Sequence, residues 1–126
     1  MKQTHLTQAG PKAIGPYSTA VIHNDTGYLS GVIPVVPETG KLVEGDAAAQ
    51  ARQVFEHMGV ILKELNRSFA DVLKTTVFLQ DIASFGAVNQ VYAEYFQTDC
   101  PARSCVEVAK LPMGALIEAE AIVAMD

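Results

Sequence analysis

The 126-residue sequence contains no tryptophan, only two cysteines and only 18% charged residues. A typical soluble domain has about 25% charged residues, and a chain of this size has a large surface relative to its volume. Because 49% of the residues are hydrophobic, the chain can build a core and is not expected to be disordered. The shortage of surface charge therefore predicts that copies of the chain bury part of their surface against one another.

Clustered positive charge is also absent. The formal net charge is −5, and no two of the nine lysines and arginines are adjacent in the sequence. Proteins that bind nucleic acids usually present a basic patch to the phosphate backbone. Nucleic acid is therefore not an expected partner.

Long apolar runs are missing as well. The run at 121–125 is far shorter than the roughly 18 residues that a membrane span needs, and the first eight residues lack the apolar stretch of a secretory signal. We therefore expect a cytoplasmic protein with no membrane contact, in which Cys100 and Cys105 are reduced thiols.

Motifs for metal-dependent, cofactor-dependent or nucleophilic chemistry do not occur. His5, His23 and His57 lack metal-ligand spacing, and the chain has no G-x-S-x-G, Walker or G-x-G-x-x-G sequence. No metal and no cofactor are expected. Cys105 has no base near it in the sequence to activate it, so a packing role is expected for this thiol.

Hydrophobic periodicity predicts one α+β domain over residues 1–126. The expected order is β-β-α-β-α-β-β, with two helices packed on one face of a mixed sheet. A turn at 24–27 joins the first two strands as a hairpin. Strands are predicted at 17–23, 28–33, 72–80, 103–109 and 116–125, and helices at about 46–66 and 84–96.

Two predictions concern packing in the second half of the chain. In the third predicted strand, alternation places Leu73 on the same face as Thr75, Val77 and Leu79. In the second helix, an aromatic group at helical spacing is expected to be core; its members are Tyr92, Tyr95 and Phe96.

The last two predicted strands carry the most informative alternation. Val106 and Val108 point to one side of the fourth strand, and Arg103 and Cys105 point to the other. In the fifth strand, Glu118 alternates with an apolar set. If the apolar sets contact the helices, then Arg103, Cys105 and Glu118 share the helix-free face, provided that the strands are adjacent and in register.

An arginine and a glutamate on such a face have two interpretations. They form either a structural ion pair, at a subunit interface or in solvent, or a pocket for a small acid. In a pocket, the guanidinium would bind a carboxylate through two parallel hydrogen bonds. A partly desolvated glutamate nearby would orient or deprotonate a water molecule. The second interpretation suits hydrolysis of a small carboxylic acid.

The segment Pro101–Pro112 is the most specific motif in the sequence. It resembles the signature of the Rid family, also called YjgF, the reactive intermediate deaminases. Further blocks along nearly the whole chain resemble the same family. They are Ala13–Ser18, Ser30–Pro34 with Pro37–Gly40, Ala48–Gln53, Lys74–Leu79, Val88-Asn89 and Ile117–Ala121.

The resemblance implies a chorismate-mutase-like fold, a homotrimeric barrel with active sites between subunits, and hydrolysis of 2-imino acids to 2-keto acids and ammonia. The substrates would be 2-iminobutanoate and 2-iminopropanoate, with no cofactor. Arg103 would hold the substrate carboxylate, and Glu118, rather than Glu120, would position the water. Other residues would bind substrate; they are Tyr17, Ser30, Gly31, Asn89 and Cys105, with Gly31 and Cys105 acting through backbone groups.

Three features depart from the family pattern and bear on loop shape and substrate size. Cys100 stands where an aromatic residue is common before Pro-Ala-Arg, the loop before it is short, and Val32 stands where glutamine is common. Two other functions compete with the deaminase. One is a ribonuclease or translation inhibitor, a role attached to some family members, and the other is a non-catalytic regulatory protein that binds small carboxylates.

Overall fold

The computed structural model describes residues 1–126 as two α-helices and six β-strands. The helices are α1 (Ala47–Glu64) and α2 (Phe85–Tyr95). The strands are β1 (Gln3–His5), β2 (Ala20–His23), β3 (Thr26–Val32), β4 (Val72–Leu79), β5 (Ala102–Glu107) and β6 (Ile117–Ala124).

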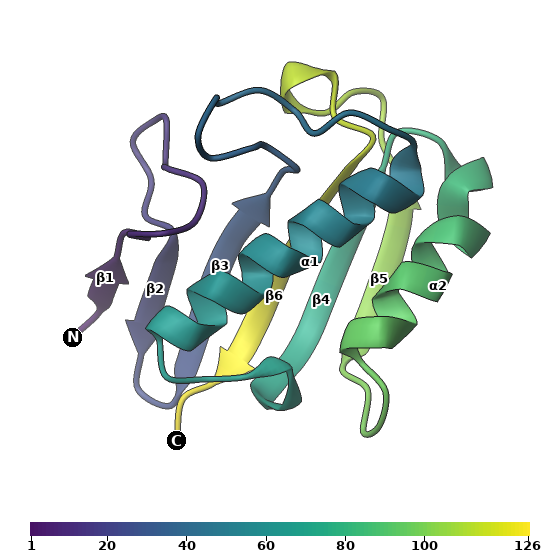
Figure 1. Ribbon diagram of the computed structural model, residues 1–126. Helices are drawn as coiled ribbons and strands as arrows, with labels where there is room; N and C mark the ends of the chain where they lie inside the picture. Colours follow the sequence, from purple (N-terminus) through teal and green to yellow (C-terminus); the bar gives the residue numbers. More distant parts are fainter.

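All six strands form one sheet in the order β1-β2-β3-β6-β4-β5. The β4–β5 pair is parallel and the other pairs are antiparallel, so the sheet is mixed. Both helices lie on the same face of the sheet, α1 across its middle strands and α2 toward β5 (Figure 1). The predicted α+β architecture is therefore confirmed. Neither helix is long and apolar enough to cross a membrane.

Helix α1 begins and packs as its sequence predicts. The Asp46 carboxylate caps the helix by accepting a hydrogen bond from the backbone N–H of Ala49, at 3.0 Å. Apolar side chains at three- and four-residue spacing form one buried stripe against the sheet. The stripe consists of Ala51, Val54, Phe55, Met58, Ile61 and Leu62.

Two predictions about strands were wrong. Strand β1 was missed because its three residues show no hydrophobic alternation, although it pairs with β2 at the edge of the sheet. Leu73 is 51% exposed, whereas Thr75, Val77 and Leu79 are buried as predicted. The register of β4 against β6 shifts between Val72 and Lys74. This bulge breaks the alternation and turns Leu73 away from the core.

The face of the sheet opposite the helices carries apolar side chains that no element of the chain covers. Tyr28 pairs with Ile122 across β3 and β6, and Val106 pairs with Phe78 across β4 and β5. Tyr28 and Val106 are 49% and 44% exposed. We call this surface the open face. Its apolar character agrees with the predicted association between copies, which stays a prediction.

Glu64, in the last turn of α1, binds the segment that follows β1. Its carboxylate accepts hydrogen bonds from the backbone N–H groups of Gln8 and Ala9, at 3.0 and 2.9 Å, and contacts the His5 ring nitrogen at 2.8 Å. Burial alone would raise the pKa of Glu64, but these hydrogen bonds outweigh it and lower the pKa to about 2. The N-terminal segment is thereby attached to the end of the helix.

Candidate active site

The strand register places Arg103 on the helix-covered face of the sheet. Arg103 is paired with Thr75 across β5 and β4, and Thr75 is paired with Ala121 across β4 and β6. Paired residues point to the same side of a sheet. Because Thr75 and Ala121 are buried under the helices, Arg103 points toward the helices too.

Glu118 lies on the opposite, open face. It is paired with Phe78, which is paired with Val106. The prediction that Arg103, Cys105 and Glu118 share the helix-free face, with Val106 toward the helices, was therefore wrong. Strand β5 lies at the edge of the sheet beside β4, and of the two helices only α2 lies near it (Figure 1). Helix α2 offers Arg103 polar and aromatic partners in place of an apolar core.

Helix α2 surrounds the Arg103 side chain with three residues. Nη1 of Arg103 donates a hydrogen bond to Oδ1 of Asn89 at 2.7 Å. The guanidinium carbon lies 4.7 Å from the ring centroid of Tyr92 and 5.4 Å from that of Phe85. No acidic side chain forms a salt bridge with Arg103. The guanidinium therefore keeps free donors for an anion from outside the chain.

Cys105 lies beside Arg103 on the same side of β5 and packs against the core. Burial raises the pKa of its thiol, and the positive charge of Arg103 offsets only part of this effect. The thiol is therefore protonated at neutral pH, which agrees with the predicted packing role and argues against a nucleophile.

The carboxylate of Glu118 is partly buried on the open face against the backbone of Gly31. A Cβ atom added at Gly31 would overlap this carboxylate, so only glycine permits the approach. Burial raises the pKa of Glu118, and the negative charge of Glu120 raises it further. A partly buried carboxylate without an ion-pair partner is a stronger base than one exposed to solvent, which suits it to accept a proton from water.

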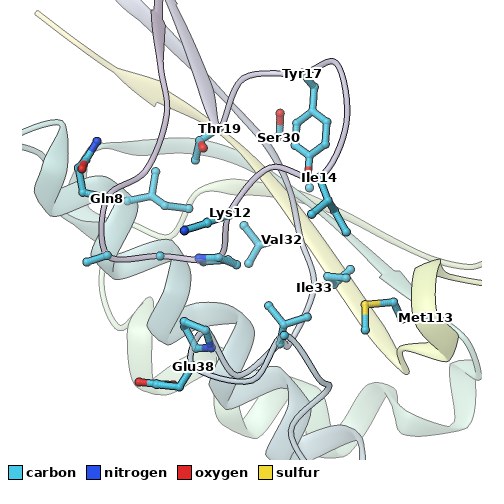
Figure 2. A pocket seen from close by; sticks show the side chains of 18 residues that line it. Gln8, Lys12, Ile14, Tyr17, Thr19, Ser30, Val32, Ile33, Glu38 and Met113 are labelled. Carbon is cyan, nitrogen blue, oxygen red and sulfur yellow. The ribbon is translucent and has the colours of Figure 1, made fainter.

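Tyr17, Ser30 and Gly31 meet at a cavity of about 480 Å³ near the end of β3. The N-terminal segment, the loop after β3 and Met113 form its other walls, and Ile14 and Lys12 project toward it (Figure 2). The Ser30 hydroxyl donates a hydrogen bond to the backbone carbonyl of Ser18 at 2.6 Å, which joins β3 to the segment that precedes β2. Its apolar lining includes Ile14, Val32, Ile33 and Met113.

The predicted site residues thus fall into two groups on one chain. We call Arg103, Asn89 and Cys105 the arginine group, and Tyr17, Ser30, Gly31 and Glu118 the glutamate group. The first lies between β5 and α2. In the second, Tyr17, Ser30 and Gly31 line the cavity near the end of β3, and Glu118 approaches Gly31 without lining the cavity itself. The sheet separates the guanidinium of Arg103 from the carboxylate of Glu118 within a single chain.

Two residues that surround Arg103 were not predicted as part of the site. Phe85 was not assigned to it, and Tyr92 was predicted only as core; Tyr92 is buried but also stacks on the guanidinium. The signal was present in the spacing, because Phe85, Asn89 and Tyr92 recur at four and three residues and so share one face of a helix.

No group of three or more histidine, cysteine, aspartate or glutamate side chains is arranged to hold a metal ion. The chemistry that the two groups offer is a cation that binds a carboxylate and a carboxylate that handles a proton. A ligand that used both would have to contact two chains.

Comparison with known proteins gives a consistent set of similarities. The family model described as endoribonuclease L-PSP matches residues 7–125. A human 2-iminobutanoate/2-iminopropanoate deaminase is 47% identical over 116 residues, which cover 92% of this chain and 85% of the human protein. A RutC family protein of Pyrococcus horikoshii is 47% identical over 122 residues, covering 97% of each.

Solved structures share the whole fold. The structure of E. coli TdcF with bound serine matches with a TM-score of 0.92 at 38% identity, covering 98% of this chain and 99% of that one. These proteins therefore have the same arrangement of one mixed sheet and two helices.

Proposed function

The chain belongs to the endoribonuclease L-PSP family, which is the YjgF/Rid family, and on that premise we propose that it is a 2-iminobutanoate/2-iminopropanoate deaminase. It hydrolyses reactive 2-imino acids, and the enamines from which they form, to 2-keto acids and ammonia. The observation that carries the proposal is that one small chain presents both a guanidinium without a salt bridge and a partly buried carboxylate without a hydrogen-bond partner. The human relative's name and the serine bound to TdcF support a small α-amino-acid-like substrate.

Arg103 binds the substrate carboxylate. Its Nη1 is held by Asn89, and its remaining N–H groups can form the paired hydrogen bonds that a carboxylate accepts. A lysine in this place would supply the charge without the fork. Binding at this end fixes the position of C2, the carbon that reacts.

Glu118 activates the water. As the water oxygen adds to C2 of the iminium, the carboxylate takes a proton from it and a carbinolamine forms. Glu118 then returns the proton to the amino nitrogen, and the C–N bond breaks with its electron pair leaving on ammonia. The hydroxyl passes its proton to the Glu118 carboxylate and becomes the keto oxygen, and Glu118 releases that proton to solvent. An iminium carbon is already electrophilic, so the proposal calls for no metal and no cofactor.

The two groups are joined between subunits. One chain supplies the arginine group and a neighbouring chain supplies the glutamate group, so that a homotrimer of Rid-type domains, each spanning residues 1–126, has three sites. The open face, with Tyr28 and Val106 exposed on it, supports an assembly in which other copies cover this surface. A repeated contact between unlike surfaces closes into a ring when its rotation allows.

The direct test supplies freshly formed 2-aminoacrylate, made from serine by a dehydratase, and follows the release of ammonia over the uncatalysed rate. The wild-type chain is expected to accelerate the release, and Arg103→Ala is expected to abolish the acceleration. A variant that keeps the full rate would remove Arg103 from the mechanism.

The family description names an endoribonuclease, so RNA belongs in the same experiment. Cleavage of RNA that depends on Arg103, with no effect on imine decay, would favour the ribonuclease. Binding of 2-ketobutyrate with no turnover of imine would instead favour a regulatory protein that binds small carboxylates.

A further inference from the structure

The Arg103 side chain is exposed and has a single hydrogen bond within the chain, so its orientation needs another source. A long side chain with many rotamers loses conformational entropy when it is held in one direction. A carboxylate clamp is effective only if the guanidinium already points the right way before the substrate arrives. The residues around Arg103 indicate how that direction is set.

Tyr92 lies at the centre of these surroundings. Its ring centroid is 4.7 Å from the guanidinium carbon of Arg103, a distance at which a cation is attracted to an aromatic face. The ring itself cannot move freely. It packs edge-on against Phe55, with 5.4 Å between centroids, and at an interplanar angle of 34° against Phe96, with 4.5 Å between centroids. Tyr92 therefore presents a rigid surface to Arg103.

A buried hydrogen bond fixes the tilt of this ring. The hydroxyl groups of Thr75 and Tyr92 lie 2.7 Å apart, and the two residues are 0% and 7% exposed. Thr75 is also the register partner of Arg103 on the neighbouring strand. The three side chains thus lie next to one another. Thr75 is beside Arg103 in the sheet and bonds to the hydroxyl end of Tyr92, and the Tyr92 ring contacts the Arg103 guanidinium.

Packing alone does not account for Thr75. It occupies a fully buried position in a strand whose other buried members, Val72, Val77 and Leu79, are aliphatic, and valine would fill the same volume without a hydroxyl to desolvate. Burial raises the pKa of Tyr92, with Thr75 and Arg103 opposing this effect, so the phenol stays neutral and available as a hydrogen-bond partner.

We propose that Thr75 and Tyr92 are positioning residues for Arg103: their hydrogen bond orients the Tyr92 ring, and the ring holds the guanidinium so that its free N–H groups face the substrate carboxylate. Asn89 fixes one edge of the guanidinium, and Tyr92 fixes its plane. This inference rests on the proposed function, in which Arg103 binds the carboxylate of an imino acid.

Three variants separate the ring from its hydroxyl. Tyr92→Leu removes the aromatic face, while Tyr92→Phe and Thr75→Val remove only the hydrogen bond and are close in volume to the native residues. Tyr95→Phe is the matched control, since Tyr95 lies on the same helix but its hydroxyl bonds to Glu56 at 2.7 Å, away from Arg103.

The expected results follow from loss of orientation rather than loss of charge. Tyr92→Leu weakens binding of 2-ketobutyrate and raises KM by about 10-fold, in the range that cation–π contacts provide. Tyr92→Phe and Thr75→Val raise KM by about 2- to 5-fold, in the range of one hydrogen bond. Tyr95→Phe changes neither quantity.

Two readouts distinguish positioning from a merely structural role. In an Arg103→Ala background, Tyr92→Leu is expected to cause no further loss of 2-ketobutyrate binding, because the group it positions is gone. The side-chain NMR signals of Arg103 are expected to be sharp in the wild type, partly broadened in Tyr92→Phe, and averaged in Tyr92→Leu. An additive loss of binding, or an Arg103 signal unchanged in Tyr92→Leu, overturns the proposal.

The NMR measurement also separates this inference from the proposed function. If the wild-type chain hydrolyses no imino acid but Tyr92→Leu releases the Arg103 guanidinium, the positioning role stands and the deaminase proposal fails. If the chain hydrolyses imino acids while KM and the Arg103 signals are the same in Tyr92→Leu and the wild type, the deaminase stands and the positioning role fails.

Discussion

Two glutamates in this protein have opposite surroundings. Glu64 accepts hydrogen bonds from the backbone of Gln8 and Ala9 and contacts His5, and its pKa is lowered to about 2. Glu118 has no hydrogen-bond partner within the chain, is partly buried, and has a raised pKa. The first environment stabilises the charged carboxylate, and the second destabilises it.

The difference indicates what each region of the molecule does. A carboxylate whose charge is stabilised by fixed donors lowers the free energy of the folded chain and has little tendency to accept a proton. A carboxylate held without partners costs stability, and natural proteins keep such groups where chemistry requires them. Glu64 therefore stabilises the fold, and Glu118 has the surroundings that the proposed deaminase reaction requires of its base.

Because the sheet separates Glu118 from Arg103 within one chain, Glu118, unlike Glu64, is predicted to act across a subunit boundary. Arg103→Ala and Glu118→Gln chains are each expected to be inactive, but chains expressed together should recover activity. If neighbouring chains supply the two groups at random around a ring, about a quarter of the sites are intact. The measurement is the rate of ammonia release from 2-aminoacrylate by the purified mixed assembly.

Mixing the two proteins without exchange of subunits provides the control, and it should stay inactive. If the coexpressed chains form mixed assemblies that are equally inactive, the site does not combine Arg103 of one chain with Glu118 of another.

Gly31 tests whether the exact place of the Glu118 carboxylate matters. In Gly31→Ala, the new methyl group would overlap that carboxylate and displace it. A misplacement of about 1 Å is expected to lower kcat by about 100-fold. Steady-state kinetics measure the change. Gly86→Ala in α2 is the control, because its added Cβ meets nothing within 4 Å and alanine favours a helix. Comparable rates in Gly31→Ala and the wild type would argue against a positioned Glu118.

Glu64 is expected to contribute to the stability of the fold rather than to proton transfer. Its lowered pKa means that its contribution is fully present above the unfolded value near 4.5 and is lost as the pH falls through about 2. Glu64→Gln is expected to reduce the free energy of unfolding by about 1–3 kcal/mol at pH 7. Denaturant unfolding at pH 7 and pH 3 measures both the loss and its pH dependence.

Glu94→Gln provides the contrast for this prediction. Glu94 also bonds to a partner, Arg52, but both side chains are about half exposed, so its removal should reduce stability much less than removal of Glu64 does. Equal effects of the two substitutions would show that Glu64 is an ordinary surface charge.

The sequence was more informative about the elements than about the faces they present. Periodicity located both helices and five strands, because the apolar stripe in α1 is typical only of a helix and the alternation in β6 is typical only of a strand. It missed β1, which has no such pattern, and it could not foresee the bulge that exposes Leu73. Pairing with a neighbouring strand determines both features.

The site shows the same limit. Alternation divides β5 into two sets but does not say which set meets the helix, and hydrophobicity favoured Val106. The structure reverses this choice, because α2 receives Arg103 with Asn89 and Tyr92 and leaves Val106 on the open face. Hydrophobicity alone does not distinguish an exposed apolar position on the open face, such as Val106, from a core position.

The smallest predicted effect concerns the charge beside Glu118. Because Glu120 raises the pKa of Glu118, Glu120→Gln should lower it. The base must be ionised to take a proton from water, so the acid limb of kcat/KM against pH should move to lower pH, by less than about one unit. Glu44→Gln, at an exposed position before α1, should leave the limb in place. A limb that stays fixed in Glu120→Gln, in an assembly of unchanged size, would mean that Glu118 does not govern the pH dependence.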